Sequence, residues 1–348
     1  MPRALLGFVM MLTLAGASPA PQPFALLGPA GQHTLPPDAV AGIVAEADAA
    51  TARQPRARAD LHTEGTLPNQ GIREESLYAK EDQPAILAMG LAWRTTGKPK
   101  YLEGADRYLL AWATTYRPSF NPIDETGFDQ LILASDLTGP DLPQSTRARL
   151  GTFWRSLATG YLDAMDGQPK NSRTNWQSHR VKLATMAAFA SGDPTLIRRA
   201  RVAYRRQVSA NIRADGSVFD FYERDALHYV TYDLDPLLMA ALSAKAHGED
   251  WYDWKARSGA SLAAAVAWLR PYALGAKTHV EFVRSRIQFD RDRAAAGQKE
   301  YAPHVWSRGA AVGTMALSAA CDLREVSTAA QVARETGRSP PAWLALVR

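Results

Sequence analysis

The chain has 348 residues, of which 46% are hydrophobic and 22% are charged, and its formal net charge is +5. This length and apolar content suffice for a full core in one large domain or two ordinary ones, which excludes a small disulfide-stapled module. The mild positive charge fits a polyanionic ligand steered by a basic cleft, and it fits solvated lysines and arginines equally well. No nucleic-acid-binding module is recognisable, so nucleic acid is not an expected partner.

Residues 1–20 have the pattern of a secretory signal peptide. A basic residue precedes a short apolar run, and small residues follow, which places cleavage after Ala17 or Ala20. The run is too short to remain as a membrane anchor. The single cysteine, Cys321, cannot form an internal disulfide. We therefore expect a periplasmic or secreted monomer with no membrane partner, folded as one domain over residues 21–348.

From about Asp38 onward, apolar residues recur at helical spacing in blocks broken by Gly, Pro or Asp-Pro. Alternating strand patterns are almost absent, so the sequence predicts an all-α fold. Long helices with short connections imply antiparallel neighbours, and the lack of a strict repeat favours a ring of helical hairpins over a solenoid. The predicted helices span roughly residues 38–53, 80–96, 98–116, 124–138, 143–166, 175–191, 194–210, 233–247, 258–272, 305–319 and 326–335.

Three long stretches lack a helical pattern, namely residues 54–79, 211–223 and 274–303. Long segments of this kind in a compact domain are usually functional. We expect them to border a cleft.

Asn175 and His179 lie four residues apart in a predicted helix, so their side chains share one face about one turn apart. Alone, this pair also fits a helix cap and a buried core histidine. A second polar stretch, about fifty residues later, supports a functional interpretation.

That second stretch contains Arg224, His228, Tyr229 and Tyr232, just before a helix expected to begin near Asp233. A purely structural helix start rarely needs a guanidinium, an imidazole and two phenols together. Tyr229 is the strongest catalytic candidate, because a positioned phenol can transfer a proton.

With these motifs the sequence resembles the alginate lyase superfamily of polysaccharide lyases, in which an Asn/His motif on one helix faces a later segment ending in Leu-x-Tyr. The matching segments are Asn175–Arg180 and Leu227–Tyr229, and His62–Gly65 and Asn121–Thr126 also resemble uncharacterised or glucuronan-type members. The resemblance spans roughly residues 60–310. It implies an incomplete (α/α) toroid, with the substrate lying across a central groove.

The resemblance also implies roles for two residues. Tyr229 matches the tyrosine that donates and accepts the proton, and His179 matches the histidine beside the substrate carboxylate. The expected reaction is β-elimination in a 4-linked polyuronate of the alginate or glucuronan type, without a metal or cofactor. Tyr229 and His179 are the candidates for acid and base, and their assignment is open.

Two positions depart from the alginate enzymes. Ser178 stands where those enzymes have an asparagine directly before the histidine, which leaves Asn175 as the expected amide. Tyr222 stands where they have an arginine, seven residues before the tyrosine, so we assign the positive charge to Arg224. Together with His179, these groups are expected to stabilise the charge that builds on the substrate carboxylate.

Further contacts with an acidic polysaccharide are expected from residues beside the motifs and from the non-helical segments. For the charged ones, a solvated surface position is equally consistent with the sequence. These candidates are Trp176, His228, Tyr232, Arg284, Arg286, Gln288, Lys80 and Arg73.

Two other functions also fit the sequence. A glycoside hydrolase on a helical ring would use a pair of carboxylates, such as Asp124 with Asp225 or Glu223. A non-catalytic periplasmic protein would bind the acidic polysaccharide without moving a proton.

Overall fold

The computed structural model describes residues 26–27 and 34–347, and the expected signal peptide lies outside them. The prediction of an all-α fold is confirmed, since the only β-structure in the described ranges is a two-stranded sheet and two isolated bridges. The α-helices are α1 (Pro37–Thr51), α2 (Arg73–Lys80), α3 (Asp82–Thr96), α4 (Pro99–Thr115), α5 (Phe128–Thr138), α6 (Gln144–Asp166), α7 (Asn175–Ser191), α8 (Pro194–Asn211), α9 (Phe219–Arg224), α10 (Leu227–Lys245), α11 (Leu262–Ala273), α12 (Gln288–Ala295), α13 (Val312–Cys321) and α14 (Val326–Thr336).

Short elements connect the later helices. Strands β1 (Val280–Glu281) and β2 (His304–Val305) pair antiparallel, and four short 3-10 helices follow or separate the C-terminal helices. These are η1 (Lys299–Tyr301), η2 (Arg308–Ala311), η3 (Leu323–Glu325) and η4 (Ala342–Leu346). No helix of the described ranges is both long enough and apolar enough to cross a bilayer.

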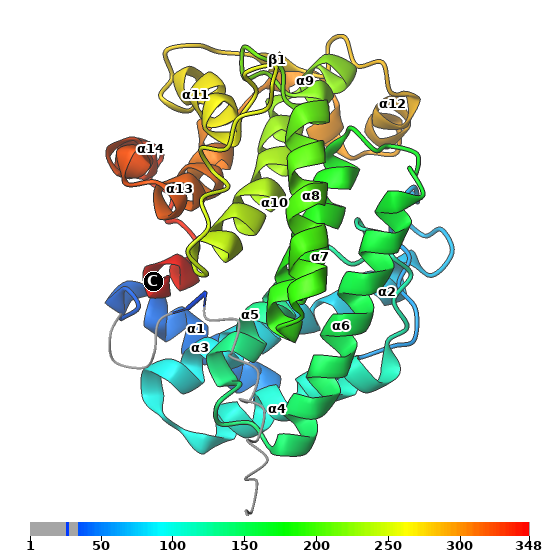
Figure 1. Ribbon diagram of the computed structural model, residues 1–348, viewed down its shortest axis with the longest axis vertical. Helices are drawn as coiled ribbons and strands as arrows, with labels where there is room; N and C mark the ends of the chain where they lie inside the picture. Colours follow the sequence, from blue (N-terminus) through cyan, green and yellow to red (C-terminus); the bar gives the residue numbers. More distant parts are fainter. Residues whose placement is uncertain (1–25, 28–33, 348) are drawn as a thin grey trace, which may run out of the picture.

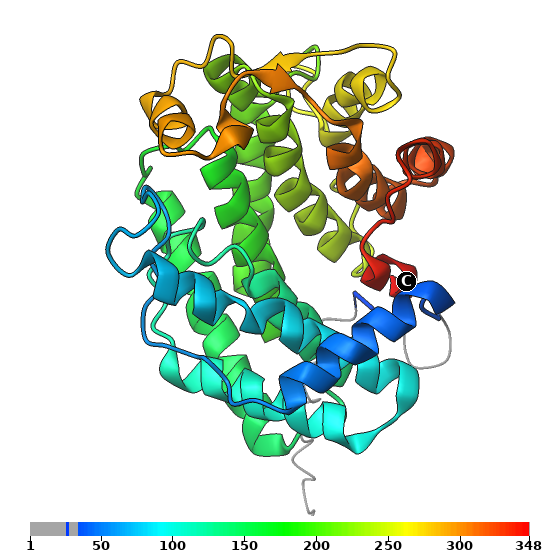
Figure 2. The ribbon, with the colours of Figure 1, turned by 180° about the vertical axis from the view of Figure 1, so that it is seen from behind.

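The helices form a curved arrangement whose ends meet. The long helices α6, α7, α8 and α10 run beside one another, with α1, α3, α4 and α5 toward one end of the molecule and α9, α11 and α12 at the other (Figure 1). Figure 2 shows the C-terminus beside α1. Leu27 forms an antiparallel bridge with Val347, the last described residue.

Helix α7 is the centre of the fold and packs between α6 and α10. Apart from Trp176 and Ala190, every residue of this helix is buried. A buried helix is normally apolar on all sides, whereas α7 carries Asn175, His179 and Lys182 inside the protein. Burying polar groups is costly unless they are hydrogen-bonded, so each of them must have a partner.

Local sequence signals placed several helix ends correctly. The Asp193 carboxylate accepts hydrogen bonds from the backbone of Thr195 and Leu196, and thus caps α8 as the Asp-Pro pair predicts. Gly97 ends α3 in the left-handed region with a φ of 64°, a conformation that glycine adopts without steric cost.

Other boundaries differ from the prediction. Helix α10 begins at Leu227, six residues before the expected start, because Pro236 is accommodated inside the helix. The segments expected to be non-helical also contain α2, α9 and α12. These helices have only six to eight residues, too few to give a clear periodic pattern.

Candidate functional site

The hydroxyl group of Tyr229 lies between two guanidinium groups. Arg224 donates from Nη1 across 2.7 Å, and Arg293 donates from Nη1 across 3.2 Å. The Arg224 guanidinium is also bound by the carboxylate of Asp290, which is 1% exposed. Two cations at one phenol oxygen favour its ionised form, which is the form that can accept a proton.

The backbone between α9 and α10 places these groups. Asp225 ends α9 in the left-handed region. Its φ is 51°, a value that residues other than glycine rarely adopt. Its carboxylate accepts a hydrogen bond of 2.8 Å from the backbone of Arg284 and lies 3.2 Å from His279. The 279–284 segment thus holds the turn that sets Arg224 beside the first turn of α10.

Burial and charge act on Tyr229 in opposite directions. The side chain is 4% exposed, and burial raises the pKa of its phenol above the ordinary value, while Arg224 and Arg293 act to lower that pKa. The phenol is therefore protonated at neutral pH in the free protein. In that state it is ready to donate a proton.

His179 lies deeper than Tyr229 and is 3% exposed. Its Nδ1 is 2.8 Å from the hydroxyl oxygen of Thr126, and its Nε2 is buried without a hydrogen bond of good geometry. Burial holds the pKa of the imidazole well below its usual value, and the nearby Lys182 ammonium adds to this effect. His179 is therefore uncharged at neutral pH.

Tyr232 connects the two candidate catalytic residues. Its ring centroid is 4.3 Å from that of His179 and 6.3 Å from that of Tyr229. Pro236, four residues later in α10, has no N–H, so the Tyr232 carbonyl lacks its ordinary intrahelical donor. This carbonyl is close enough to the imidazole to favour its protonated form.

Asn175, the amide expected beside a substrate carboxylate, is bound to a carboxylate of the protein in this structure. Its backbone N–H donates to the Asp220 carboxylate across 2.8 Å, and its side-chain amide donates to the same carboxylate. Burial raises the pKa of Asp220 to about 6, while these bonds from Asn175 favour its charged form. The amide is thus already engaged in joining α7 to α9.

Ser178 faces the same buried network. Its hydroxyl donates to Asp233 across 2.6 Å and accepts from Gln207 across 2.9 Å. The serine in place of the expected asparagine is therefore a bridge between α7, α8 and α10 in this chain.

Two cavities border the candidate residues. One of about 350 Å³ is lined by Asn175, Trp176, Glu223 and Arg224, among others. A second, of about 630 Å³, is lined by His179, Tyr232, Lys182 and apolar residues of α1, α3 and α13. The four predicted catalytic residues thus belong to one neighbourhood of α7, α9 and α10, but they do not face a single cavity.

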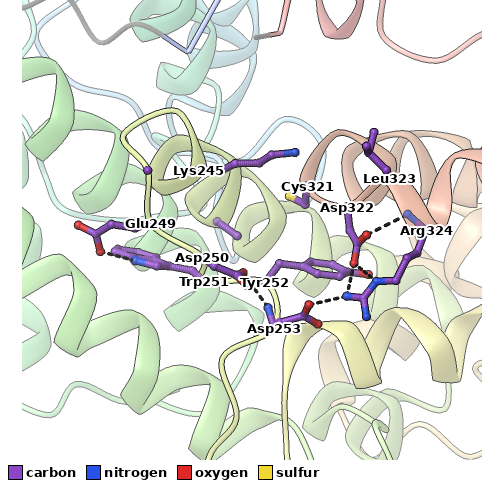
Figure 3. Close-up of a pocket in the computed structure, with 12 residues that line it drawn as sticks. Lys245, Glu249, Asp250, Trp251, Tyr252, Asp253, Cys321, Asp322, Leu323 and Arg324 are labelled. Atoms are coloured by element: carbon purple, nitrogen blue, oxygen red, sulfur yellow. Dashed lines mark hydrogen bonds and ion pairs between the residues drawn. The ribbon is translucent and has the colours of Figure 1, made fainter.

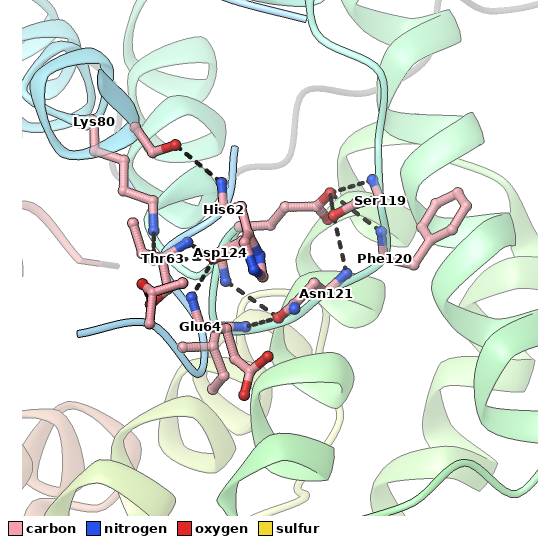
Figure 4. Close-up of polar contacts among 12 residues, drawn as sticks. His62, Thr63, Glu64, Lys80, Ser119, Phe120, Asn121 and Asp124 are labelled. Atoms are coloured by element: carbon pink, nitrogen blue, oxygen red, sulfur yellow. Dashed lines mark hydrogen bonds and ion pairs between the residues drawn. The ribbon is translucent and has the colours of Figure 1, made fainter. Parts of the chain in front are cut away.

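A polar cluster on another part of the chain joins residues 62–64 to Asp124, which is two residues before Thr126 (Figure 4). The carboxylate of Asp124 accepts hydrogen bonds from the backbone of Thr63 and Glu64, across 2.6 and 2.9 Å, and lies 3.3 Å from the His62 ring. Lys80 donates to the Thr63 hydroxyl across 2.8 Å. Residues 62–64 are thereby held against the segment that contacts His179.

The adjacent Glu125 fixes the same segment from inside. Its carboxylate accepts hydrogen bonds from the hydroxyls of Tyr116 and Tyr161 and from the backbone of Ser119 and Phe120. Phe120 has a φ of 58°, and its ring occupies the space where a side chain at Gly160 would lie. Thr126 therefore has a rigid support.

The remaining predicted contact residues divide into two groups. His228 and Trp176 are half-buried beside the site, and His228 stacks on Tyr232 with ring planes 8° apart. The Arg284 side chain is 84% exposed, and Arg286 and Gln288 are also exposed. Arg73 pairs with Glu74 at the start of α2.

The carboxylates of the hydrolase alternative have structural partners. Asp124 holds residues 62–64, and Asp225 holds the turn after α9. Glu223 lines the smaller cavity. Two of the three candidates are thus already engaged in positioning loops, which does not favour their use as an acid and base pair.

A further cavity, of about 470 Å³, lies at the other end of α10 (Figure 3). Lys245, which lines it, is sixteen residues from Tyr229 along the helix, or roughly 24 Å. Arg324 there pairs with Asp253 and Asp322. This cavity is remote from the candidate residues.

Sequence reasoning missed three residues of the site. Arg293 and Asp290 lie on α12, which has no clear helical pattern, and Thr126 is a common residue in a loop. Asp290 is buried and pairs with Arg224. Only the lack of a helical pattern in residues 274–303 pointed to this segment.

Comparisons with known proteins agree with this architecture. The family model described as alginate lyase matches residues 38–279. A "Polysaccharide lyase" of Stenotrophomonas maltophilia (strain K279a) is 36% identical over 111 residues, which cover 30% of this chain and 32% of that relative, so the match spans about a third of its length.

Solved structures show the same fold. An alginate lyase from Bacteroides ovatus superimposes with a TM-score of 0.62 at 16% identity, covering 87% of this chain and 90% of the other. Alginate lyase A1-III from Sphingomonas species A1 gives a TM-score of 0.52 at 21% identity, covering 63% and 67%. A histidine-to-alanine variant of that enzyme, complexed with tetrasaccharide, gives 0.52 at 20% identity, again covering 63% and 67%.

The predicted helical toroid is thereby confirmed. Because the family model covers more than half of the sequence, this chain belongs to the alginate lyase family.

Proposed function

We propose that this protein is a polysaccharide lyase that cleaves 4-linked polyuronates by β-elimination. The observation that carries the proposal is the Tyr229 hydroxyl held by two guanidinium groups, at 2.7 and 3.2 Å. The family and the name of the S. maltophilia relative support this class of reaction. The tetrasaccharide complex of alginate lyase A1-III supports an oligosaccharide ligand for the same fold.

In this reaction the proton on C5 leaves, the electron pair forms a C4–C5 double bond, and the C4–O4 bond breaks. The leaving oxygen takes a proton, and no water is consumed. Negative charge builds on the carboxylate attached to C5, so donors aimed at that group accelerate the step. Arg224 is the cation nearest to the Tyr229 hydroxyl, and Asp290 holds it in place.

Tyr229 is the group that we assign to proton transfer. As a phenol it can protonate O4, and as a phenolate stabilised by Arg224 and Arg293 it can accept the C5 proton. His179 is the other candidate base, for substrates in which the two groups lie on opposite faces of the sugar. Asn175, engaged with Asp220, would border the smaller cavity with Trp176 rather than act alone.

The stereochemistry of the sugar tests this assignment. In mannuronate and glucuronate the C5 hydrogen and O4 lie on the same face of the ring, so one tyrosine can serve both. In guluronate they lie on opposite faces, and a second proton-transferring group is required. Tyr229 acting alone therefore favours polymannuronate and glucuronan over polyguluronate.

The experiment is to incubate the protein with polymannuronate, polyguluronate and glucuronan, with a chelator present, and to record near-ultraviolet absorbance. Elimination creates a conjugated double bond that absorbs there, and hydrolysis does not. Tyr229→Phe should lose roughly 10²–10⁴-fold in turnover, the usual contribution of a positioned acid or base.

Tyr272→Phe is the matched control, because Tyr272 lies on α11 and not on α10. Its ring packs on Trp268 of the same helix, with the ring centroids 5.3 Å apart. It should retain turnover. Reducing ends that form without absorbance would reject the lyase in favour of a hydrolase. Binding without cleavage, unchanged in Tyr229→Phe, would support the non-catalytic alternative.

A further inference from the structure

Lys182 lies close to His179 on α7 and is 4% exposed. Its ammonium group donates to three oxygens, namely the Thr126 carbonyl at 2.8 Å, the Thr126 hydroxyl at 3.0 Å and the Asp129 carboxylate at 2.6 Å. This set fills the three donor positions of an ammonium group. Lys182 is thus fixed in place and directs one of its hydrogens at the Thr126 hydroxyl oxygen.

This contact determines the direction of the next hydrogen bond. An ammonium group can only donate, so the Thr126 oxygen accepts from Lys182. The Thr126 hydroxyl hydrogen then needs an acceptor, and the acceptor within the described part of the chain is Nδ1 of His179, at 2.8 Å. If Nδ1 carried the hydrogen instead, the hydroxyl hydrogen would be buried without a partner, at a cost of about 1–3 kcal/mol.

An uncharged imidazole has one N–H group, which must therefore be on Nε2 of His179. The Nε2 atom is the one without a hydrogen bond of good geometry, although the Tyr232 carbonyl lies close to the imidazole, and the His179 side chain borders the 630 Å³ cavity. Protonation of the ring is opposed by burial and by the neighbouring Lys182 charge. Other charged groups beside Lys182 are Asp129, which pairs with it, and Asp235, which borders the same cavity.

We propose that Thr126 and Lys182 are positioning residues that hold His179 as an uncharged Nε2–H donor, and that His179 is therefore not the base of the reaction. One consequence rests on the proposed lyase function, namely that Tyr229 transfers both protons of the elimination.

The tautomer of His179 can be measured without substrate. Two-bond ¹H–¹⁵N correlation spectra of the ¹⁵N-histidine-labelled protein distinguish Nε2–H, Nδ1–H and doubly protonated rings, and a His179→Gln spectrum identifies the signal. In the wild-type protein we expect Nε2–H without titration between about pH 5.5 and 8, because the pKa of the ring lies well below its usual value.

Variants test the two positioning residues. Thr126→Val and Lys182→Met should populate the Nδ1–H form, whereas Thr126→Ser should keep Nε2–H. Thr185→Val is the matched control, because Thr185 is a buried threonine of α7 whose hydroxyl has no hydrogen-bond partner. In turnover assays, Thr126→Val should lower kcat about 10- to 100-fold with KM changed less than about two-fold.

A wild-type His179 that carries Nδ1–H, or that is charged at pH 7, would overturn the proposal. So would a Thr126→Val protein with the wild-type tautomer and kcat. Failure of the lyase function is distinguishable, because it would appear as an absence of ultraviolet-absorbing product from the wild-type protein, whatever its tautomer.

Discussion

Arg293 donates a hydrogen bond to the Tyr229 hydroxyl across 3.2 Å, although 64 residues separate the two in the chain. The guanidinium of Arg293 also lies 4.6 Å from the ring centroid of Tyr301 and 4.3 Å from that of Phe289. Aromatic faces on two sides restrict its rotation and attract its charge. The second cation at the phenol is thus held by α12 and the segment that follows it.

Replacing Arg293 by Met should therefore raise the pKa of the Tyr229 phenol, because a cation that lowers it is removed. If the phenolate is the base, activity rises with pH in the alkaline range, and this rise should shift to higher pH in the variant. We expect turnover at pH 8 to fall about 10- to 100-fold. Arg291→Met, two residues earlier on α12 and exposed, is the control and should keep the wild-type profile. An unchanged alkaline limb in Arg293→Met would contradict the role of this residue.

Asp290 and Asp292 offer a second matched pair on α12. Asp290 is buried and binds both Arg224 and the hydroxyl of Ser285, whereas Asp292 accepts from Gln288 near the surface. Asp290→Asn should lower the free energy of unfolding by about 1–3 kcal/mol, because a largely buried guanidinium loses its charged partner. Asp292→Asn should change it by less than about 0.5 kcal/mol. Urea denaturation measures both changes. Equal changes would show that the buried pair of Asp290 and Arg224 contributes no more to stability than the surface contact of Asp292.

The helices were predictable where their signals are local. Apolar spacing and breakers such as Gly97 and Asp193-Pro194 act within a few residues, and they placed α3 and α8 almost to the residue. The start of α10 was misplaced because proline usually marks a first turn, and here Pro236 lies in the third. Packing of α10 against α7 outweighs the lost hydrogen bond.

The site was predictable only in part, because its contacts are long-range. Tyr229 and His179 were proposed from their chemistry and from the resemblance of their motifs. Their partners Arg293 and Thr126 come from segments 64 and 53 residues away, and no pattern in one sequence reports such proximity. Asn175 was assigned to substrate because nothing in the sequence indicates its bond to Asp220.

Lys80 offers a test by pH. Burial lowers its pKa to about 8, although Asp124 and Glu125 act in the opposite direction. Below that pH the ammonium group is present to attract a uronate carboxylate, and above it the group is neutral. If Lys80 contacts substrate, KM should rise as the pH increases through about 8. Lys80→Arg should remove this rise, because arginine remains charged in this range. Kinetics from pH 6.5 to 9.5 provide the measurement, and an identical KM profile in both proteins would exclude a contact.

Glu125 tests whether the support of Thr126 matters for catalysis. One of its oxygens accepts from Tyr116, Ser119 and Phe120, and the other accepts from Tyr161. Glu125→Gln can keep the first oxygen, and the Tyr161 hydroxyl can turn to accept from the new amide, so the loss of stability should stay below about 1.5 kcal/mol.

Glu125→Ala leaves those buried donors without an acceptor and should cost more than about 3 kcal/mol. Burial raises the pKa of Glu125, so its charged form weakens the fold as the pH increases above the ordinary carboxyl range, and Gln should remove that pH dependence. Denaturation at pH 5 and 8 measures both effects. Because Thr126 directly follows Glu125, the alanine variant should also lose turnover under conditions in which it remains folded. Full activity in folded Glu125→Ala would show that His179 is positioned without this support.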